Sequence, residues 1–143
     1  SFADYYCDLI TKHNIKNKYF KRRDIRLYDE SLMGVERQVA KRAGLAKQER
    51  IMGFFQDLAH RFASGNSLDE LGDEINTRLA QEDRPLPRPK RICFIGDGTL
   101  LEYDRFWCLI RASGTDALLR YYIEGEDKGK IEAYQRSLIN IRV

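Results

Sequence analysis

Cysteine, histidine and long apolar runs are scarce in this sequence of 143 residues. It holds three cysteines and two histidines. Cys7, Cys93 and Cys108 have no spacing that suits a metal site, and an odd number of cysteines cannot all pair. Cys93 and Cys108 lie in apolar runs, where a free thiol behaves as a small hydrophobe, so we expect a reducing, cytoplasmic setting. No apolar run approaches the ~20 residues of a membrane-spanning helix, and no segment resembles a signal peptide. We therefore do not expect membrane insertion.

A strong charge of one sign is also missing. The 25 basic and 22 acidic residues leave a formal charge of +3, which does not by itself predict a nucleic-acid binder. One segment is an exception, with only Asp24 opposing its basic residues: Lys12, Lys16, Lys18, Lys21, Arg22, Arg23 and Arg26. We interpret this segment as a solvated stretch or as a docking surface for another part of a larger protein. A contact with a phosphate backbone is the alternative.

The first half of the sequence has helical periodicity. Residues 1–15 have rough helical spacing, and the longest signal runs from Leu32 to Ala63. The apolar stripe expected there comprises Val35, Val39, Ala43, Ala46, Ile51, Phe54, Phe55, Leu58 and Phe62. Ser67 and Glu70 have the spacing of a capping box, so a second, shorter helix is expected to begin there.

Strand-like segments follow a proline-rich connector, residues 84–89, that cannot continue a helix. They are Ile92–Ile95, Thr99–Tyr103, Phe106–Ile110 and Leu118–Glu124, with a hairpin turn at Asp97-Gly98; residues 24–28 offer a further short strand. Strands joined by such short turns are antiparallel neighbours, and a last helix is expected from Glu126-Asp127. The sequence therefore predicts an α+β fold: a small antiparallel four-stranded sheet with helices on one face, preceded by a mostly helical N-terminal segment.

The loop at residues 111–116, Arg-Ala-Ser-Gly-Thr-Asp, offers several groups to an anion. Arg111 supplies a planar fork of donors that keeps its charge, and Ser113 and Thr115 bring hydroxyl groups. Gly114 leaves the approach open and is able to take positive φ. A polar hairpin turn with an incidental arginine is the plainer interpretation of such a loop.

Two further side chains favour the anion-binding interpretation of the loop. Arg120, in the following strand, adds a second positive charge if it faces the loop. Asp116 repels phosphate, and we expect it to hold an arginine in place. The whole order therefore points to a site for an anionic group: an apolar strand, an arginine, a hydroxyl residue, a glycine, a second hydroxyl residue, an acid, an apolar strand and a second arginine.

The stretch Trp107–Glu124, WCLIRASGTDALLRYYIE, is similar to the signature of the last domain of the α-D-phosphohexomutases. That family includes phosphoglucomutases and phosphomannomutases, and its last domain carries an R-x-S-G-T-[E/D] loop followed by an arginine. The resemblance covers about residues 90–140 and implies a TATA-box-binding-protein-like fold. It also implies phosphate-binding roles for Arg111, Ser113, Gly114, Thr115 and Arg120. Asp116 replaces the commoner glutamate, and Ala117 stands where proline is usual.

The resemblance implies a mechanism for a longer protein. Members of the family exchange a phosphate between C1 and C6 of a sugar through a phosphoserine and a bisphosphate intermediate, and Mg²⁺ assists. Their last domain grips the phosphate that is not reacting. The sequence holds no serine loop, aspartate-rich metal loop or sugar-binding loop of that family. It also begins at Ser1 rather than Met, so we expect a fragment without catalytic residues or a metal of its own. Mg²⁺ is expected in a domain outside the fragment.

The resemblance also implies a division of the chain and a set of partners. We expect residues 1–30 to be the tail of a preceding mutase domain or a linker, and residues 31–143 to form the C-terminal phosphate-binding domain. The expected partners are a hexose 1-phosphate or 6-phosphate and the preceding domains of the same chain. A nucleic-acid-binding module and a purely structural cap are the alternatives.

Overall fold

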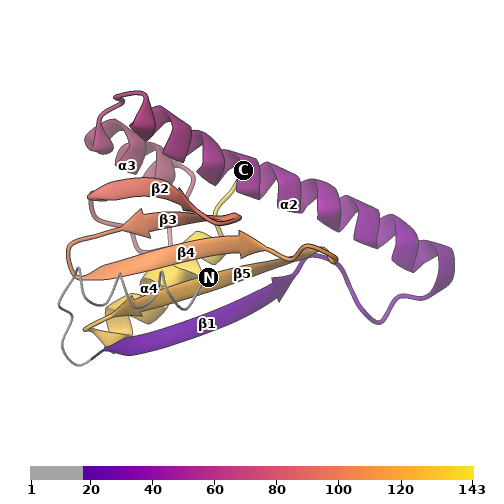
Figure 1. The fold of residues 1–143 in the computed structure, drawn as a ribbon. Helices are drawn as coiled ribbons and strands as arrows, with labels where there is room; N and C mark the ends of the chain where they lie inside the picture. The colour runs from indigo at the N-terminus through magenta and orange to yellow at the C-terminus, as the bar shows by residue number, and fades with distance from the viewer. Residues whose placement is uncertain (1–17) are drawn as a thin grey trace.

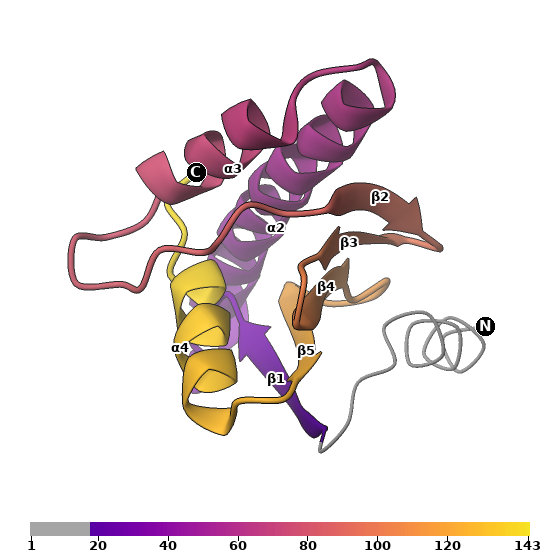
Figure 2. The same cartoon turned by 90° about the vertical axis from the view of Figure 1, so that its left-hand side faces the viewer.

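The computed structural model describes residues 18–143, which form a five-stranded antiparallel sheet with three helices packed on one side of it (Figures 1 and 2). The elements along the chain are β1 (Tyr19–Arg26), α2 (Gly34–Ala63), α3 (Leu68–Thr77), β2 (Arg91–Ile95), β3 (Gly98–Glu102), β4 (Phe106–Ala112), β5 (Leu118–Gly125) and α4 (Lys128–Ile139). The predicted α+β class is confirmed.

The sheet has one strand more than the four that the sequence predicts. The strand order is β1-β5-β4-β3-β2, and every neighbouring pair is antiparallel. Strands β2 to β5 follow one another through short turns, whereas β1 joins the far edge beside β5. The sequence of β1, YFKRRDIR, is mostly charged and lacks the alternation that marks a half-buried strand. Charged side chains are common on edge strands because they oppose pairing with other molecules.

The division of the chain at residue 30 stays a prediction. The structure adds that residues 19–26, within the part expected to be a tail or linker, pair with β5 over the whole of β1. The helical segment expected at residues 1–15 lies outside the described residues, as do Cys7 and His13.

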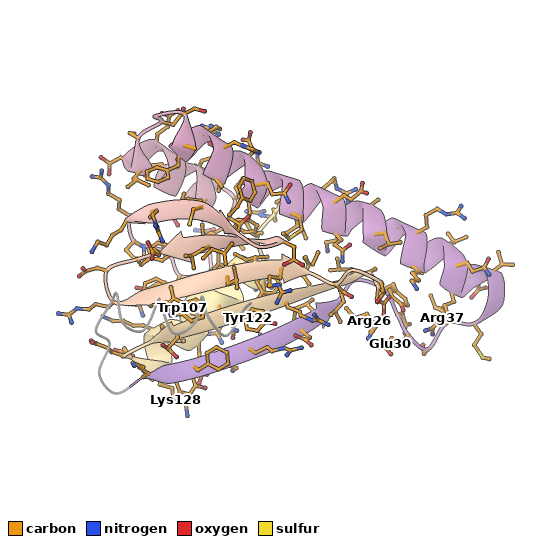
Figure 3. The ribbon with its side chains drawn as sticks, viewed as in Figure 1. Arg26, Glu30, Arg37, Trp107, Tyr122 and Lys128 are labelled. Atoms are coloured by element: carbon orange, nitrogen blue, oxygen red, sulfur yellow. The ribbon has the colours of Figure 1, made fainter. Side chains whose placement is uncertain are left out.

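The main core lies between the sheet and the helices. Phe55 and Leu58 of α2 are fully buried, as is Leu71 of α3. They belong to the same cluster as the alternate side chains of β4 and β5 that face the helices. The other face carries a smaller buried cluster around Trp107 and Tyr122, which Figure 3 labels on neighbouring strands. Tyr121 belongs to the main core and Tyr122 to the smaller cluster, so these consecutive residues of β5 face opposite sides of the sheet.

Only the second part of the apolar stripe predicted for α2 is packed. Ile51, Phe55 and Leu58 are buried, but Val35 and Val39 are 75% and 58% exposed. Figure 1 shows why: the N-terminal end of α2 extends beyond the edge of the sheet, so no strand lies beneath it. The expectation that the buried stripe includes Val35, Val39, Ala43 and Ala46 is therefore wrong, because all four residues are exposed.

The predicted cap of α3 is confirmed. The side chain of Ser67 accepts a hydrogen bond from the Glu70 amide at 3.1 Å, as the capping-box spacing predicts.

The predicted turn between β2 and β3 is displaced by one residue. Gly96 and Asp97 form the turn, with Gly96 at a φ of 61°, and Gly98 is the first residue of β3 and pairs with Ile95. None of the helices in residues 18–143 has the length and the apolar character needed to cross a membrane.

Candidate functional site

The loop between β4 and β5 presents its tip to solvent. The amide of Ser113 donates to the carbonyl of Leu118 at 2.9 Å and so closes the hairpin, while Gly114 and Thr115 are exposed. A Cβ atom added at Gly114 would meet nothing within 4 Å, so space above the loop is open as expected. Positive φ angles occur at other glycines and not at Gly114. Gly114 therefore does not use the positive φ that a glycine allows, and it contributes the absence of a side chain.

Arg111 lies across the end of β3 and reaches the turn between β2 and β3. Its Nε donates to Asp97 Oδ1 at 2.8 Å, and its Nη2 lies 3.4 Å from Oδ2. The hydrogen bond from Arg111 lowers the pKa of Asp97 below its ordinary value, and the same bond raises the pKa of Arg111. A Cβ atom at Gly98 would lie 2.6 Å from Cγ of Arg111. The absence of a side chain at Gly98 therefore provides the space that the aliphatic part of the Arg111 side chain occupies.

Arg120 stands directly opposite Arg111 in the pairing of β5 with β4. Opposite residues of an antiparallel pair share one face of the sheet, and like charges there repel each other. On the other side of Arg120 its partner in β1 is Asp24, but that carboxylate is engaged by Arg22 at 2.8 Å. The buried Nε of Arg120 has no hydrogen-bond partner in the described part of the chain. Two arginines thus occupy directly opposite positions of neighbouring strands next to the open loop.

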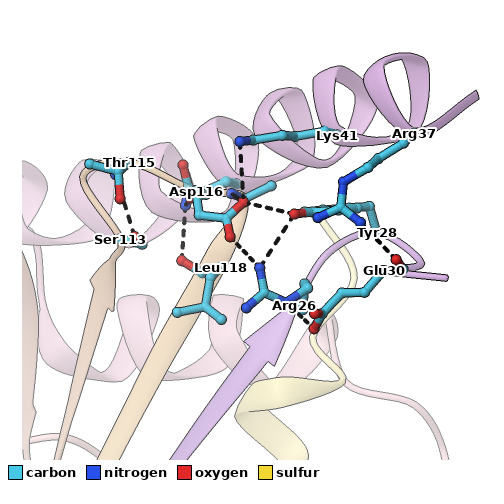
Figure 4. A network of polar contacts seen from close by, with 11 residues as sticks. Arg26, Tyr28, Glu30, Arg37, Lys41, Ser113, Thr115, Asp116 and Leu118 are labelled. Atoms are coloured by element: carbon cyan, nitrogen blue, oxygen red, sulfur yellow. Dashed lines mark hydrogen bonds and ion pairs between the residues drawn. The ribbon is translucent and has the colours of Figure 1, made fainter. Parts of the chain in front are cut away.

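Asp116 holds an arginine in place, as the sequence suggests, but the arginine is Arg26 of β1 rather than Arg111. Figure 4 shows the contacts: Arg26 and the Tyr28 hydroxyl donate to the carboxylate, and Lys41 Nζ of α2 lies 3.7 Å from it. Burial acts to raise the pKa of Asp116. The hydrogen bonds from Arg26, the Ala117 amide and Tyr28 outweigh burial, and the net pKa is below its ordinary value. The carboxylate thereby fastens the second half of the loop to β1 and α2.

Together these contacts describe a site suited to one small anionic group. Arg111 and Arg120 supply positive charge, Ser113 and Thr115 supply hydroxyl groups on a loop whose tip is open, and the Asp116 carboxylate is neutralised by its own cations. A guanidinium fork suits two oxygens of one phosphate. No group of three His, Cys, Asp or Glu side chains that suits a metal ion occurs within residues 18–143.

The sequence predicts the loop and both arginines but not the residues that support them. In the sequence, Asp97 and Gly98 indicate only a turn, and Arg26 is one member of a basic segment. Nothing in the sequence distinguishes Gln48, which donates two hydrogen bonds to the loop backbone. The Asp-Gly pair, which stands one strand before the strand that carries Arg111, is a local signal for Asp97 alone.

Two comparisons with known proteins match part of the chain. Residues 74–141 match the family described as "Phosphoglucomutase/phosphomannomutase, C-terminal domain". The phosphoglucosamine mutase of Geotalea daltonii (strain DSM 22248 / JCM 15807 / FRC-32) is 30% identical over 99 residues, which cover 64% of this chain and 22% of the relative. The matched part of the chain thus spans about a fifth of that relative's length.

Proposed function

We propose that this chain binds the phosphate of a sugar phosphate, because residues 74–141 match the phosphoglucomutase/phosphomannomutase C-terminal domain. In the proposed longer mutase, the domain grips the phosphate that is not reacting while the other end of the sugar exchanges its phosphate through a phosphoserine. Binding at a remote group holds the reacting end in line and so lowers the barrier. The groups that break and form bonds are assigned to other parts of that protein, and the Mg²⁺ of the family is assigned there too.

The observation that carries this proposal is the pairing of Arg111 with Arg120 beside the open loop. Two cations at directly opposite sheet positions destabilise each other, and a doubly charged phosphate between them relieves that repulsion. The hydroxyl groups of Ser113 and Thr115 lie on the same loop, and Gly114 adds no side chain that blocks an oxygen. The proposed ligand is therefore a hexose 6-phosphate or 1-phosphate, bound through its phosphate.

The two alternatives have less support. A single-stranded nucleic acid stacks its bases on several exposed aromatic side chains of a sheet. Here Phe20 of β1 is 41% exposed, but its neighbours Trp107 and Tyr122 are buried. A purely structural cap does not explain why the Nε of Arg120 is buried without a partner in the described residues. The phosphate-binding function accounts for this donor, because an anion beside Arg111 lies within reach of both arginines.

Calorimetric titration of the chain with glucose 6-phosphate tests the proposal. The chain is expected to bind glucose 6-phosphate and not glucose, because recognition is through the phosphate. Replacing Arg111 by alanine is expected to weaken binding by about 1–3 kcal/mol, the range for lost hydrogen bonds to a charged group. Arg23→Ala is the matched control: it removes the same charge from β1, where Arg23 pairs with Tyr121 on the other face of the sheet.

Three outcomes would contradict the proposal. Equal affinity of the Arg111→Ala variant and the unaltered chain would favour the structural cap. Salt-sensitive binding of duplex DNA that glucose 6-phosphate does not displace would favour the nucleic-acid module. An unaltered chain that binds neither glucose 6-phosphate nor inorganic phosphate would remove the proposed ligand class.

A further inference from the structure

One face of α2 lies against the second half of the phosphate loop. Lys41, Gly44 and Gln48 are spaced by three and four residues and therefore share one side of the helix. Their contacts all reach residues 116–118, where the loop turns into β5. This three-residue face, which we call the loop seat, lies outside the arginine and hydroxyl groups that are proposed to touch the ligand.

Gln48 connects the helix to the backbone of the loop. Its side-chain amide nitrogen donates to the carbonyls of Asp116 and Leu118, both at 2.9 Å. Gln48 is only 7% exposed, and a polar side chain buried in a helix face is costly unless it is hydrogen-bonded. The Leu118 carbonyl also accepts from the Ser113 amide at 2.9 Å. A single carbonyl therefore links Gln48 to the first hydroxyl-bearing residue of the site.

Gly44 allows the helix to approach the loop closely. A Cβ atom at this position would lie 2.8 Å from the carbonyl oxygen of Leu27 and 3.0 Å from Cβ of Ala117. The first of these is a backbone atom and cannot rotate away, so a larger residue at position 44 has to move the helix or the chain beneath it. Gly53, nine positions later in α2, would place a Cβ within 4 Å of nothing.

The loop seat is joined by contacts from the end of β1. The amide of Leu27 donates to the Ala117 carbonyl at 2.9 Å, and Arg26 and Lys41 both approach the Asp116 carboxylate. Residues 116–118 are thus held from two sides, while Gly114 and Thr115 at the tip are exposed. The position of the loop tip therefore depends on where residues 116–118 are held.

We propose that the loop seat positions the phosphate loop, with Gly44 and Gln48 acting as positioning residues that do not touch the ligand. This inference rests on the proposed phosphate-binding function and adds to it. A shift of residues 116–118 moves the Leu118 carbonyl, and with it the Ser113 amide that donates to this carbonyl. A shifted loop therefore offers a poorer fit to phosphate although Arg111, Ser113, Thr115 and Arg120 are all present.

Three variants of the chain test this inference with glucose 6-phosphate and inorganic phosphate as probes. Gly44→Ala introduces the clash, and Gln48→Met removes both donated hydrogen bonds while keeping a similar side-chain length. Gly53→Ala is the matched control, because it makes the same chemical change in the same helix without a neighbour to displace. Affinity is measured by calorimetry, and amide ¹H–¹⁵N spectra report the backbone positions of Ser113, Gly114 and Thr115. Thermal unfolding shows whether each variant is folded at the temperature of the titration.

Gly53→Ala is expected to leave affinity and the three amide signals unchanged. For Gln48→Met we expect affinity to fall about two- to tenfold, the effect of losing hydrogen bonds of ordinary strength, and the three amide signals to shift before ligand is added. Gly44→Ala is expected to do the same if it folds; if it does not fold, Gln48→Met decides the question alone.

Two results separate this inference from the function on which it rests. If the unaltered chain binds phosphate and folded Gln48→Met binds it equally well with unshifted amide signals, the loop seat has no positioning role. If the unaltered chain binds neither probe, the proposed function itself is wrong.

Discussion

The guanidinium of Arg111 is held by the carboxylate of Asp97, with Nε and Oδ1 2.8 Å apart, across the end of β3. Asp97 belongs to the β2–β3 turn and lies 14 residues earlier in the chain. The contact leaves the arginine oriented in the absence of ligand, and it also places a negative charge next to a site proposed for phosphate. The two effects oppose each other: orientation favours binding, whereas the charge of Asp97 disfavours it.

Asp97→Asn separates these two effects. Asparagine keeps an oxygen that accepts from Arg111 but removes the negative charge. We expect glucose 6-phosphate to bind more tightly, by less than about 1 kcal/mol, because a charge at the surface interacts weakly through water. The gain is expected to shrink in high salt, which screens exposed charges. Calorimetric titrations at low and high salt measure both effects, and weaker binding by Asp97→Asn would show that the carboxylate charge is itself needed to orient Arg111.

The two ends of α2 are expected to respond differently to truncation of an apolar side chain. Phe55 is fully buried and Val39 is 58% exposed. We expect Phe55→Ala to lower the free energy of unfolding by about 3–5 kcal/mol, as for other large-to-small changes in a core. Val39→Ala is expected to change it by no more than about 0.5 kcal/mol. Urea denaturation of both variants measures the difference, and a large loss from Val39→Ala would show that the end of the helix is packed in solution.

Local sequence signals predicted the parts of the fold that depend on neighbouring residues. The Ser67 cap, the turn between β2 and β3 (predicted one residue too late) and the strands β2 to β5 all depend on chemistry within a few positions. Strand β1 was predicted only in part, as a short strand at residues 24–28 and not as a fifth member of the sheet. Its place in the sheet depends on pairing with β5, which lies about a hundred residues later, and the charged residues Lys21, Arg22 and Arg23 show no period-two pattern.

The candidate site, like the fold, was predictable where it depends on neighbouring residues and not where it depends on distant ones. The order of residues in the loop pointed to Arg111, Ser113 and Thr115 without any structure. The supporting contacts were not visible, since Arg26 and Asp116 are 90 positions apart and Gln48 looks like any polar helix residue. A sequence shows which groups suit an anion. The residues that keep those groups in position come from distant parts of the chain, and only the tertiary fold brings them together.

The last prediction concerns the dependence of stability on pH through Asp116. Its pKa in the folded chain lies below the ordinary 3.8, because hydrogen bonds from Arg26, the Ala117 amide and Tyr28 outweigh the effect of burial. A carboxyl with a lowered folded pKa stabilises the fold above its unfolded pKa, and this contribution is lost as the pH falls through the folded pKa. Asp116→Asn is therefore expected to lower the free energy of unfolding at pH 7, and the difference from the unaltered chain should shrink below about pH 4. Urea denaturation at pH 7 and pH 3 measures this, with the exposed Asp104→Asn as a control for loss of a surface carboxylate. An equal difference at both pH values would mean that the ionised form of Asp116 does not fasten the loop.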